Sequence, residues 1–177
     1  MHETENLYII DSSSLIEIKR RYPKRTLPGI WGDLHALCLA DKLIAPIEVK
    51  NEILYRDDEL KRWVEDHDRI FQATDHAVIE KTREVLSIFP EMSDFNSQNN
   101  AQADPFLIGL ALIHTDPVQH RFDTREVFVV SEETSDIEKN PKLPFSQVKK
   151  IPDVCNHFEL KCINHLEMFK LEGFWFH

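Results

Sequence analysis

Residues 8–25 read YIIDSSSLIEIKRRYPKR, and the beginning of this stretch indicates the fold. The apolar, β-prone run ends abruptly in a carboxylate, Asp11. Such a run is typical of a strand that is buried on both faces of a parallel sheet. Three serines follow, and serine is a good helix cap. The stretch therefore predicts a buried strand with an acid at its carboxyl end, followed directly by a helix.

Short apolar strands alternate with helical patterns along the rest of the chain. We expect further strands at Leu43–Ala45, Val127–Val130 and Val148–Ile151. Helical spacing predicts helices at Ile30–Ala40, Ile47–Tyr55, Asp57–Asp66, Ala77–Phe89, Ala101–His114 and Cys155–Leu171. Loops are expected at Tyr22–Gly29, Pro90–Gln98 and Thr134–Pro144, the second of them mobile. This alternation predicts an α/β fold with a parallel sheet covered on both faces, and residues 1–177 are expected to form a single domain.

The composition narrows the class of protein. Of 177 residues, 42% are hydrophobic and 29% are charged, which is typical of a globular protein. No apolar run approaches the roughly 20 residues that span a bilayer, so no membrane association is expected. Three cysteines cannot all pair within the chain, which favours a reduced, cytoplasmic setting. The formal net charge of −10 argues against non-specific coating of duplex DNA, although a local basic patch can still meet phosphates.

Acidic residues stand at the ends of several predicted elements. Asp11 and the pair Glu132–Glu133 follow strands, where parallel sheets bind their ligands. Glu52 lies in the apolar segment IEVKNEIL, and Asp104 lies near the start of a buried helix. Taken singly, each acid is explained as a helix cap, a first-turn acid or an exposed residue. Together they predict an oxygen-ligand site that suits Mg²⁺ or Mn²⁺, ions that activate water and neutralise phosphate charge.

Four segments resemble, in the same order, the signature segments of PIN domains: YIIDSSSLI, APIEVKNEIL, ADPFLIGLAL and VFVVSEE. The resemblance covers about the whole chain, and the C-terminal tail is similar to that of a less characterised PIN-like subfamily. It implies a three-layer α/β fold with a short-stranded parallel central sheet. It also implies a metal-dependent endoribonuclease, in many members the toxin of a bacterial toxin–antitoxin pair. RNA, a cognate antitoxin and a second copy of the chain are then the expected partners.

Carried over residue by residue, the resemblance assigns the ligands of Mg²⁺ or Mn²⁺ to four acids: Asp11, Glu52, Asp104 and Glu133. Ser13 and Ser131 take two further family positions and would orient carboxylates or a bound water. The family usually has Asp where Glu133 stands. Glu132 beside it leaves the identity of the fourth acid open.

The basic stretch after the first strand has two explanations of equal weight. Its members are Lys19, Arg20, Arg21, Lys24 and Arg25. They would contact RNA phosphates around the acidic site, or they would form a solvated helix end that the helix dipole favours. The sequence leaves both explanations open.

Two other functions and one other metal site are weaker alternatives. A PIN-type fold without chemistry would serve as a protein-interaction module. A phosphatase with Asp11 as nucleophile lacks the second Asp of the haloacid-dehalogenase-type motif, because Ser13 stands there. A zinc site is the third alternative, with ligands Cys155, His157, Cys162 and His165. Their spacing does not match a zinc finger, and the apparent helical recurrence of the cysteines assigns them to the core.

Overall fold

The computed structural model describes residues 5–56, 58–93, 103–118 and 125–174. These residues form a five-stranded parallel sheet with the strand order β3-β2-β1-β4-β5. Its strands are β1 (Asn6–Ile10), β2 (Leu43–Pro46), β3 (Phe71–Gln72), β4 (Glu126–Val130) and β5 (Lys161–Ile163). All five are short, as the sequence predicts.

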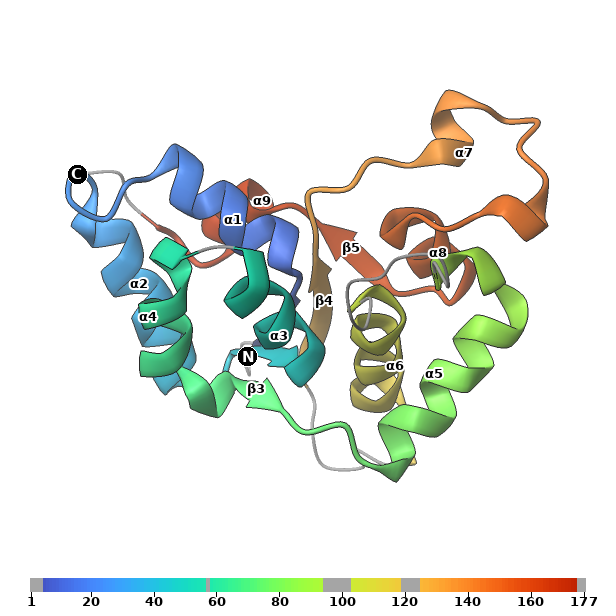
Figure 1. Cartoon of the computed structure of the whole chain (residues 1–177), viewed down its shortest axis with the longest axis horizontal. Coiled ribbons are helices and arrows are strands. Elements are labelled where there is room, and N and C mark those ends of the chain that lie inside the picture. Colours follow the sequence, from blue (N-terminus) through green and yellow to red (C-terminus); the bar gives the residue numbers. More distant parts are fainter. Residues whose placement is uncertain (1–4, 57, 94–102, 119–124, 175–177) are drawn as a thin grey trace.

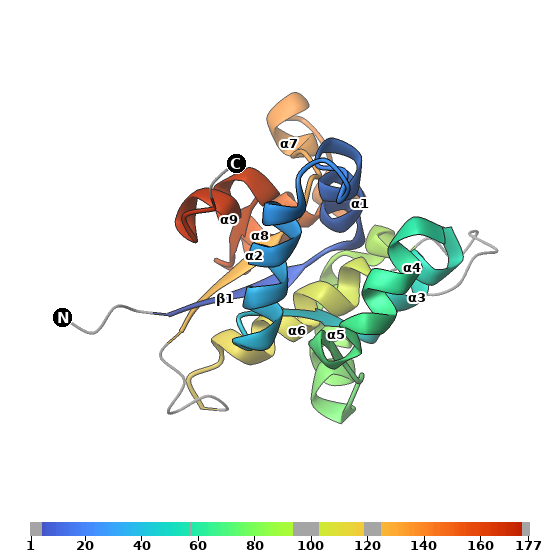
Figure 2. The ribbon, with the colours of Figure 1, turned by 90° about the vertical axis from the view of Figure 1, so that its left-hand side faces the viewer.

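Helices cover both faces of the sheet, so the predicted three-layer α/β fold is confirmed. They are α1 (Ser12–Arg21), α2 (Pro28–Leu39), α3 (Ile47–Arg56), α4 (Asp58–Asp66), α5 (His76–Ile88), α6 (Asp104–Thr115), α7 (Asp136–Lys139), α8 (Ile151–His157) and α9 (His165–Leu171). Figures 1 and 2 show α1, α2 and α9 on one side of the sheet and α5, α6 and α8 on the other. Among the described residues, every helix is too short or too polar to cross a membrane.

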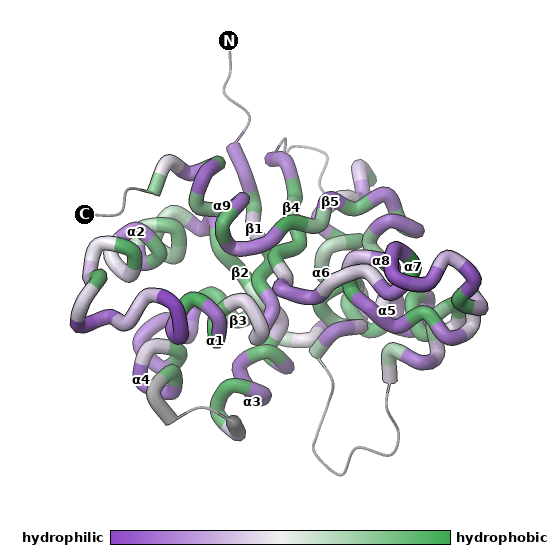
Figure 3. The backbone as a smooth tube through the Cα atoms, turned by 90° about the horizontal axis from the view of Figure 1, so that it is seen from above, coloured by the Kyte–Doolittle hydropathy of each residue, from purple (hydrophilic) through white to green (hydrophobic). Residues whose placement is uncertain are grey.

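The two central strands are the most apolar, because helices cover them on both sides. Four of the five residues of β1 are buried, and β4 has the same pattern. Figure 3 shows β4 turning hydrophobic after its polar first residue. The strands pair in parallel from Asn6 with Glu126 to Ile10 with Val130, so both end at the same level. The residues that follow β1 and β4 therefore lie side by side.

The direction of the chain crossovers reverses between β1 and β4. From β1 the chain passes to β2 and β3 on one side, and later to β4 and β5 on the other. In open parallel sheets, this reversal leaves a crevice outside the carboxyl ends of the two strands, where ligands bind. The fold thus places a candidate site directly beyond Ile10 and Val130.

The C-terminal part of the chain differs from the sequence prediction. The predicted helix Cys155–Leu171 is wrong, because this segment contains the end of α8, strand β5 and helix α9. Helix α8 ends where Glu159 takes a left-handed conformation with φ 55° and the Leu160 amide bonds the Cys155 carbonyl at 2.9 Å. A non-glycine residue rarely takes that conformation, so the sequence carried no stop signal.

The other differences are smaller. The strand predicted at Val148–Ile151 is wrong: Ile151 begins α8, whose first turn accommodates a proline, and β5 takes the edge of the sheet instead. The predicted loop Thr134–Pro144 contains the short helix α7. Strand β3 was not predicted. Of the loop predicted at Pro90–Gln98, residues 90–93 include a single 3₁₀ turn, and the remainder lies outside the described residues.

Candidate functional site

Asp11 lies at the junction of β1, α1 and β4. Its amide donates to the Val130 carbonyl at 2.9 Å, which extends the β1–β4 pairing by one residue. Its carboxylate caps α1, accepting from the Ser12 amide at 2.7 Å and from the Ser13 hydroxyl at 2.5 Å. The Ser131 hydroxyl approaches the same carboxylate from β4 at 3.4 Å. Asp11 is therefore both a helix cap and a buried acid at the sheet edge, only 3% exposed.

Glu52 and Asp104 reach the same place from two other helices. Glu52 on α3 accepts from the Ser12 hydroxyl at 2.7 Å and from the Ala103 amide at 3.0 Å. These bonds join α3 to the starts of α1 and α6. Asp104 is the first residue of α6, and no described residue donates a hydrogen bond to its carboxylate. Asp104 thus adds a carboxylate without a described donor.

Glu132 and Glu133 point to different neighbours. Glu133 accepts from the Lys150 ammonium at 2.6 Å and from the Ile151 amide at 2.8 Å. Glu132 accepts from the backbone amide of His165 at 3.0 Å and lies 2.8 Å from Nδ1 of the same residue. Since the charge of Glu133 acts on both Asp11 and Asp104, Glu133 belongs to the acidic group. Glu132 instead ties the end of β4 to the start of α9.

The pKa values of two acids reflect burial first and the charges of neighbouring carboxylates second. Burial, followed by the charges of Asp11, Glu133 and Glu52, raises the pKa of Asp104 to about 8. Burial raises the pKa of Asp11 to about 6, although its hydrogen bond from Ser13 opposes the rise. The favourable helix N-terminus does not compensate at Asp104, since a helix dipole contributes only about 0.3–1 kcal/mol. The site therefore holds more negative charge than its own donors neutralise.

The donor set suits Mg²⁺ or Mn²⁺, but the side chains are not gathered around one point. Four carboxylates are hard oxygen ligands, and Asp104 lacks a described donor. In the described part of the chain, no three Asp, Glu, His or Cys side chains are placed to hold an ion together. Glu52 and Glu133 are instead occupied by protein hydrogen bonds. Binding of an ion by this set would require side-chain rearrangement.

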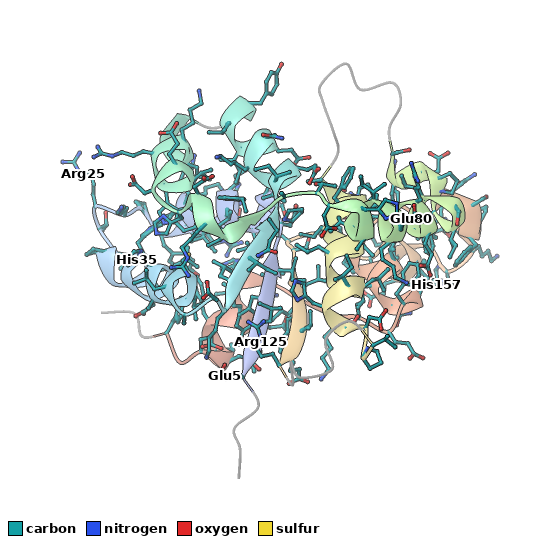
Figure 4. All side chains as sticks on the ribbon, turned by 90° about the horizontal axis from the view of Figure 1, so that it is seen from below. Glu5, Arg25, His35, Glu80, Arg125 and His157 are labelled. Carbon is teal, nitrogen blue, oxygen red and sulfur yellow. The ribbon has the colours of Figure 1, made fainter. Side chains whose placement is uncertain are left out.

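The basic stretch lies at the far end of α1 from Asp11. The helix has 10 residues and is about 15 Å long. Arg20 and Arg21 both pair with Glu17 on the same helix, and both remain more than half exposed. Arg25 lies at the periphery of the molecule (Figure 4). The structure thus does not bring these residues into the acidic group, and phosphate contact by them stays a prediction.

Sequence reasoning missed Lys150 and named His165 only as a candidate zinc ligand. Lys150 contacts Glu133, and His165, which is 1% exposed, contacts Glu132. Lys150 follows another lysine in a polar segment and carries no distinguishing pattern. For His165 a signal existed, because the Asn164–Glu167 capping box marks the start of α9.

A family model described as "Domain of unknown function (DUF4411)" matches residues 8–176. The chain belongs to this family. The match to DUF4411 includes Asp11, Glu52, Asp104 and Glu133, so the whole acidic group lies inside the family domain. The chain matches no curated protein and no solved structure.

The raised pKa of Asp104 predicts how the stability of this DUF4411 domain depends on pH. An unfolded aspartate titrates near 3.9. Because the folded carboxyl titrates at about 8, its ionisation costs nothing below pH ~4 and opposes folding fully above pH ~8. The metal-free protein should therefore lose stability between about pH 4 and about pH 8 and level off above that, as measured by denaturant unfolding. Asp104→Asn should flatten that decline and stabilise the protein at pH 9.

Asp33→Asn is the matched control, since Asp33 is a partly exposed residue of α2 outside the acidic group. It should keep the wild-type slope between about pH 4 and about pH 8. If an Asp104→Asn variant loses stability over this range as steeply as the wild type, Asp104 is not the acid whose ionisation opposes folding.

Proposed function

We propose that this DUF4411 protein is a metal-dependent endoribonuclease of PIN type. The observation that carries the proposal is the gathering of acids from four elements beyond β1 and β4. They are Asp11 after β1, Glu52 on α3, Asp104 on α6 and Glu133 after β4. These segments are separated widely in the sequence, and the parallel sheet brings them to one edge. The raised pKa values of Asp11 and Asp104 add support, because displaced pKa values cluster at functional sites.

The acids would hold one or two divalent ions, Mg²⁺ or Mn²⁺. Asp11 is the most firmly oriented of them, because Ser13 and Ser131 both donate to the same oxygen, Oδ2. When bound, such an ion activates water and neutralises charge on a phosphoryl oxygen. Burial of Asp11 and Asp104 favours a cation here, because a buried negative charge needs a counter-charge.

The choice of RNA rests on the resemblance to PIN domains. The same resemblance supports a toxin of a bacterial toxin–antitoxin pair, with an antitoxin protein as partner. A cytoplasmic location is supported by the cysteines, since Cys38, Cys155 and Cys162 are all free thiols. The basic stretch at the end of α1 would contact RNA about 15 Å from Asp11, along a strand that extends past the site.

Purified protein should cleave a mixed RNA pool only when Mg²⁺ or Mn²⁺ is present, and chelator should stop cleavage. Denaturing gel electrophoresis of end-labelled RNA measures this directly. A parallel assay with a small phosphate monoester should release no phosphate, which separates the nuclease from a phosphatase. If no RNA is cut with either ion and expression does not slow growth, a non-catalytic interaction module becomes the better account.

A further inference from the structure

Lys150 forms an ion pair with the acidic group. Its ammonium lies 2.6 Å from Oε1 of Glu133, and the two side chains are 33% and 20% exposed. Its charge also acts on Asp104, where it lowers the pKa against the combined effect of burial and three carboxylates. A partly buried ion pair in this setting is screened less by salt than a surface pair. Lys150 thus acts as a counter-charge for both acids.

The backbone fixes the position of this lysine. Lys150 is the N-cap of α8, and the next amide, of Ile151, donates to Oε2 of Glu133 at 2.8 Å. Both oxygens of Glu133 are therefore held by residues 150 and 151. Asp153, two residues further on, accepts from the amide of Asp136 at 2.8 Å and from the hydroxyl of Ser135. The segment between Glu133 and Lys150 is thereby attached to α8 at its beginning as well as at its end.

We infer that Lys150 is a built-in counter-cation that competes with the divalent metal ion for Glu133. An oxygen that accepts from an ammonium at 2.6 Å has one lone pair engaged and its negative charge partly neutralised, so it is a poorer ligand for a divalent ion. A divalent ion beside Asp104 and Asp11 would also be repelled by the ammonium across a site of low dielectric. Metal binding would therefore release Lys150 from Glu133. This inference rests on the proposed function, because it takes these acids to be the metal ligands.

Replacement of Lys150 by methionine tests the competition. Lys150→Met keeps the length of the side chain and removes its charge. Isothermal titration with Mn²⁺ should show a dissociation constant at least about tenfold lower than that of the wild type. The metal-free variant should melt at a lower temperature, because the acids lose their counter-charge. Its melting temperature should then rise further on addition of Mn²⁺ than that of the wild type.

Lys149→Met is the matched control, because Lys149 is exposed, adjacent and of the same charge. It changes the net charge equally, so it reveals any long-range effect on metal affinity. A second variant, Lys150→Arg, keeps the charge and should bind Mn²⁺ about as the wild type does. Combining Lys150→Met with Glu133→Gln should remove most of the gain in affinity, since the contested ligand is gone.

The outcomes separate this inference from the proposed function. If Mn²⁺ binds the wild type, and Lys150→Met and Lys149→Met have the same affinity, the competition is refuted while the nuclease proposal stands. Weaker binding by Lys150→Met would also refute it, since Lys150 would then support the metal site. If Mn²⁺ binds Lys150→Met but not the wild type, the competition is supported in its strongest form. If Mn²⁺ binds none of the variants, both ideas fail.

Discussion

Under the proposed nuclease function, Glu52→Gln should leave a folded protein whose metal-dependent RNA cleavage is lower by about two to three orders of magnitude. Glutamine can keep both hydrogen bonds of Glu52: its oxygen accepts from the Ala103 amide, and its NH₂ group donates to Ser12. The fold and the junction between α3 and α6 are therefore retained. What is lost is one negative charge of the acidic group. Single-turnover cleavage of a labelled RNA, with melting temperature measured alongside, separates loss of chemistry from loss of fold.

Glu80→Gln is the control for this variant. Glu80 is an exposed residue of α5 (Figure 4), and its described ion pairs, with His76 and Arg83, lie on the surface. The same chemical change there should leave cleavage unchanged. If Glu52→Gln cleaves RNA as fast as Glu80→Gln, Glu52 has no part in catalysis, and the acidic group would have to work without it.

Gly109→Ala should destabilise the protein, although alanine is the better helix former. Gly109 lies in α6 where this helix packs against α5, and the two run side by side in Figure 1. A Cβ atom at this position would lie 2.6 Å from the Thr82 hydroxyl and 3.1 Å from the Thr82 backbone nitrogen. The hydroxyl can rotate, but the backbone nitrogen cannot move without shifting α5. Overpacking costs about 1–3 kcal/mol and should exceed the helix-propensity gain of about 1 kcal/mol.

Gly32→Ala is the matched control, with the opposite expected sign. Gly32 lies inside α2 and is exposed, and an added Cβ would meet no atom within 4 Å apart from its chain neighbours and the backbone of its own helix. At Gly32 only the difference in helix propensity between glycine and alanine acts, so the protein should gain about 0.5–1 kcal/mol of folding stability. Each kcal/mol moves the melting temperature of a domain of this size by about 2–4 °C. In thermal melting, Gly32→Ala should therefore have a higher melting temperature than the wild type, and Gly109→Ala a lower one. A Gly109→Ala protein that melts above the wild type would show that the α5–α6 contact is looser than described.

The space at Gly109 can be checked independently. Thr82 is 3% exposed, and its hydroxyl has no described hydrogen-bond partner. Thr82→Ala removes the atom nearest to the new Cβ. The cost of Gly109→Ala should be smaller in the Thr82→Ala background, and the difference measures the contact between the two positions.

Local sequence determined the central strands and the position of the first acid. After their polar first residues, the runs that form β1 and β4 are apolar, because a parallel sheet covered on both faces excludes water from both sides of a strand. Asp11 follows the first run directly, and its place at the end of a buried strand can be read without coordinates. The helices from α2 to α6 were likewise predicted to within a few residues, since their apolar spacing is regular.

The C-terminal elements could not be predicted from local sequence in the same way. Helix α8 ends through a left-handed glutamate, and β5 is only three residues long. The sequence of so short a segment does not by itself favour a strand over a helix. Lys161–Ile163 becomes a strand because β4 offers an unpaired edge, which is a tertiary condition.

The tertiary structure alone decided which of Glu132 and Glu133 joins the other acids and what neutralises the group. Glu132 and Glu133 are neighbours of identical type, so sequence could not rank them. The path of the backbone after β4 directs Glu133 toward Asp104 and Glu132 toward His165. Lys150 joins the site through the N-terminus of α8, a contact that no local pattern encodes. The sequence gives the type of each side chain. Which charges lie near one another depends on distances between segments that are far apart in the chain. Only the packing of the sheet and helices sets those distances.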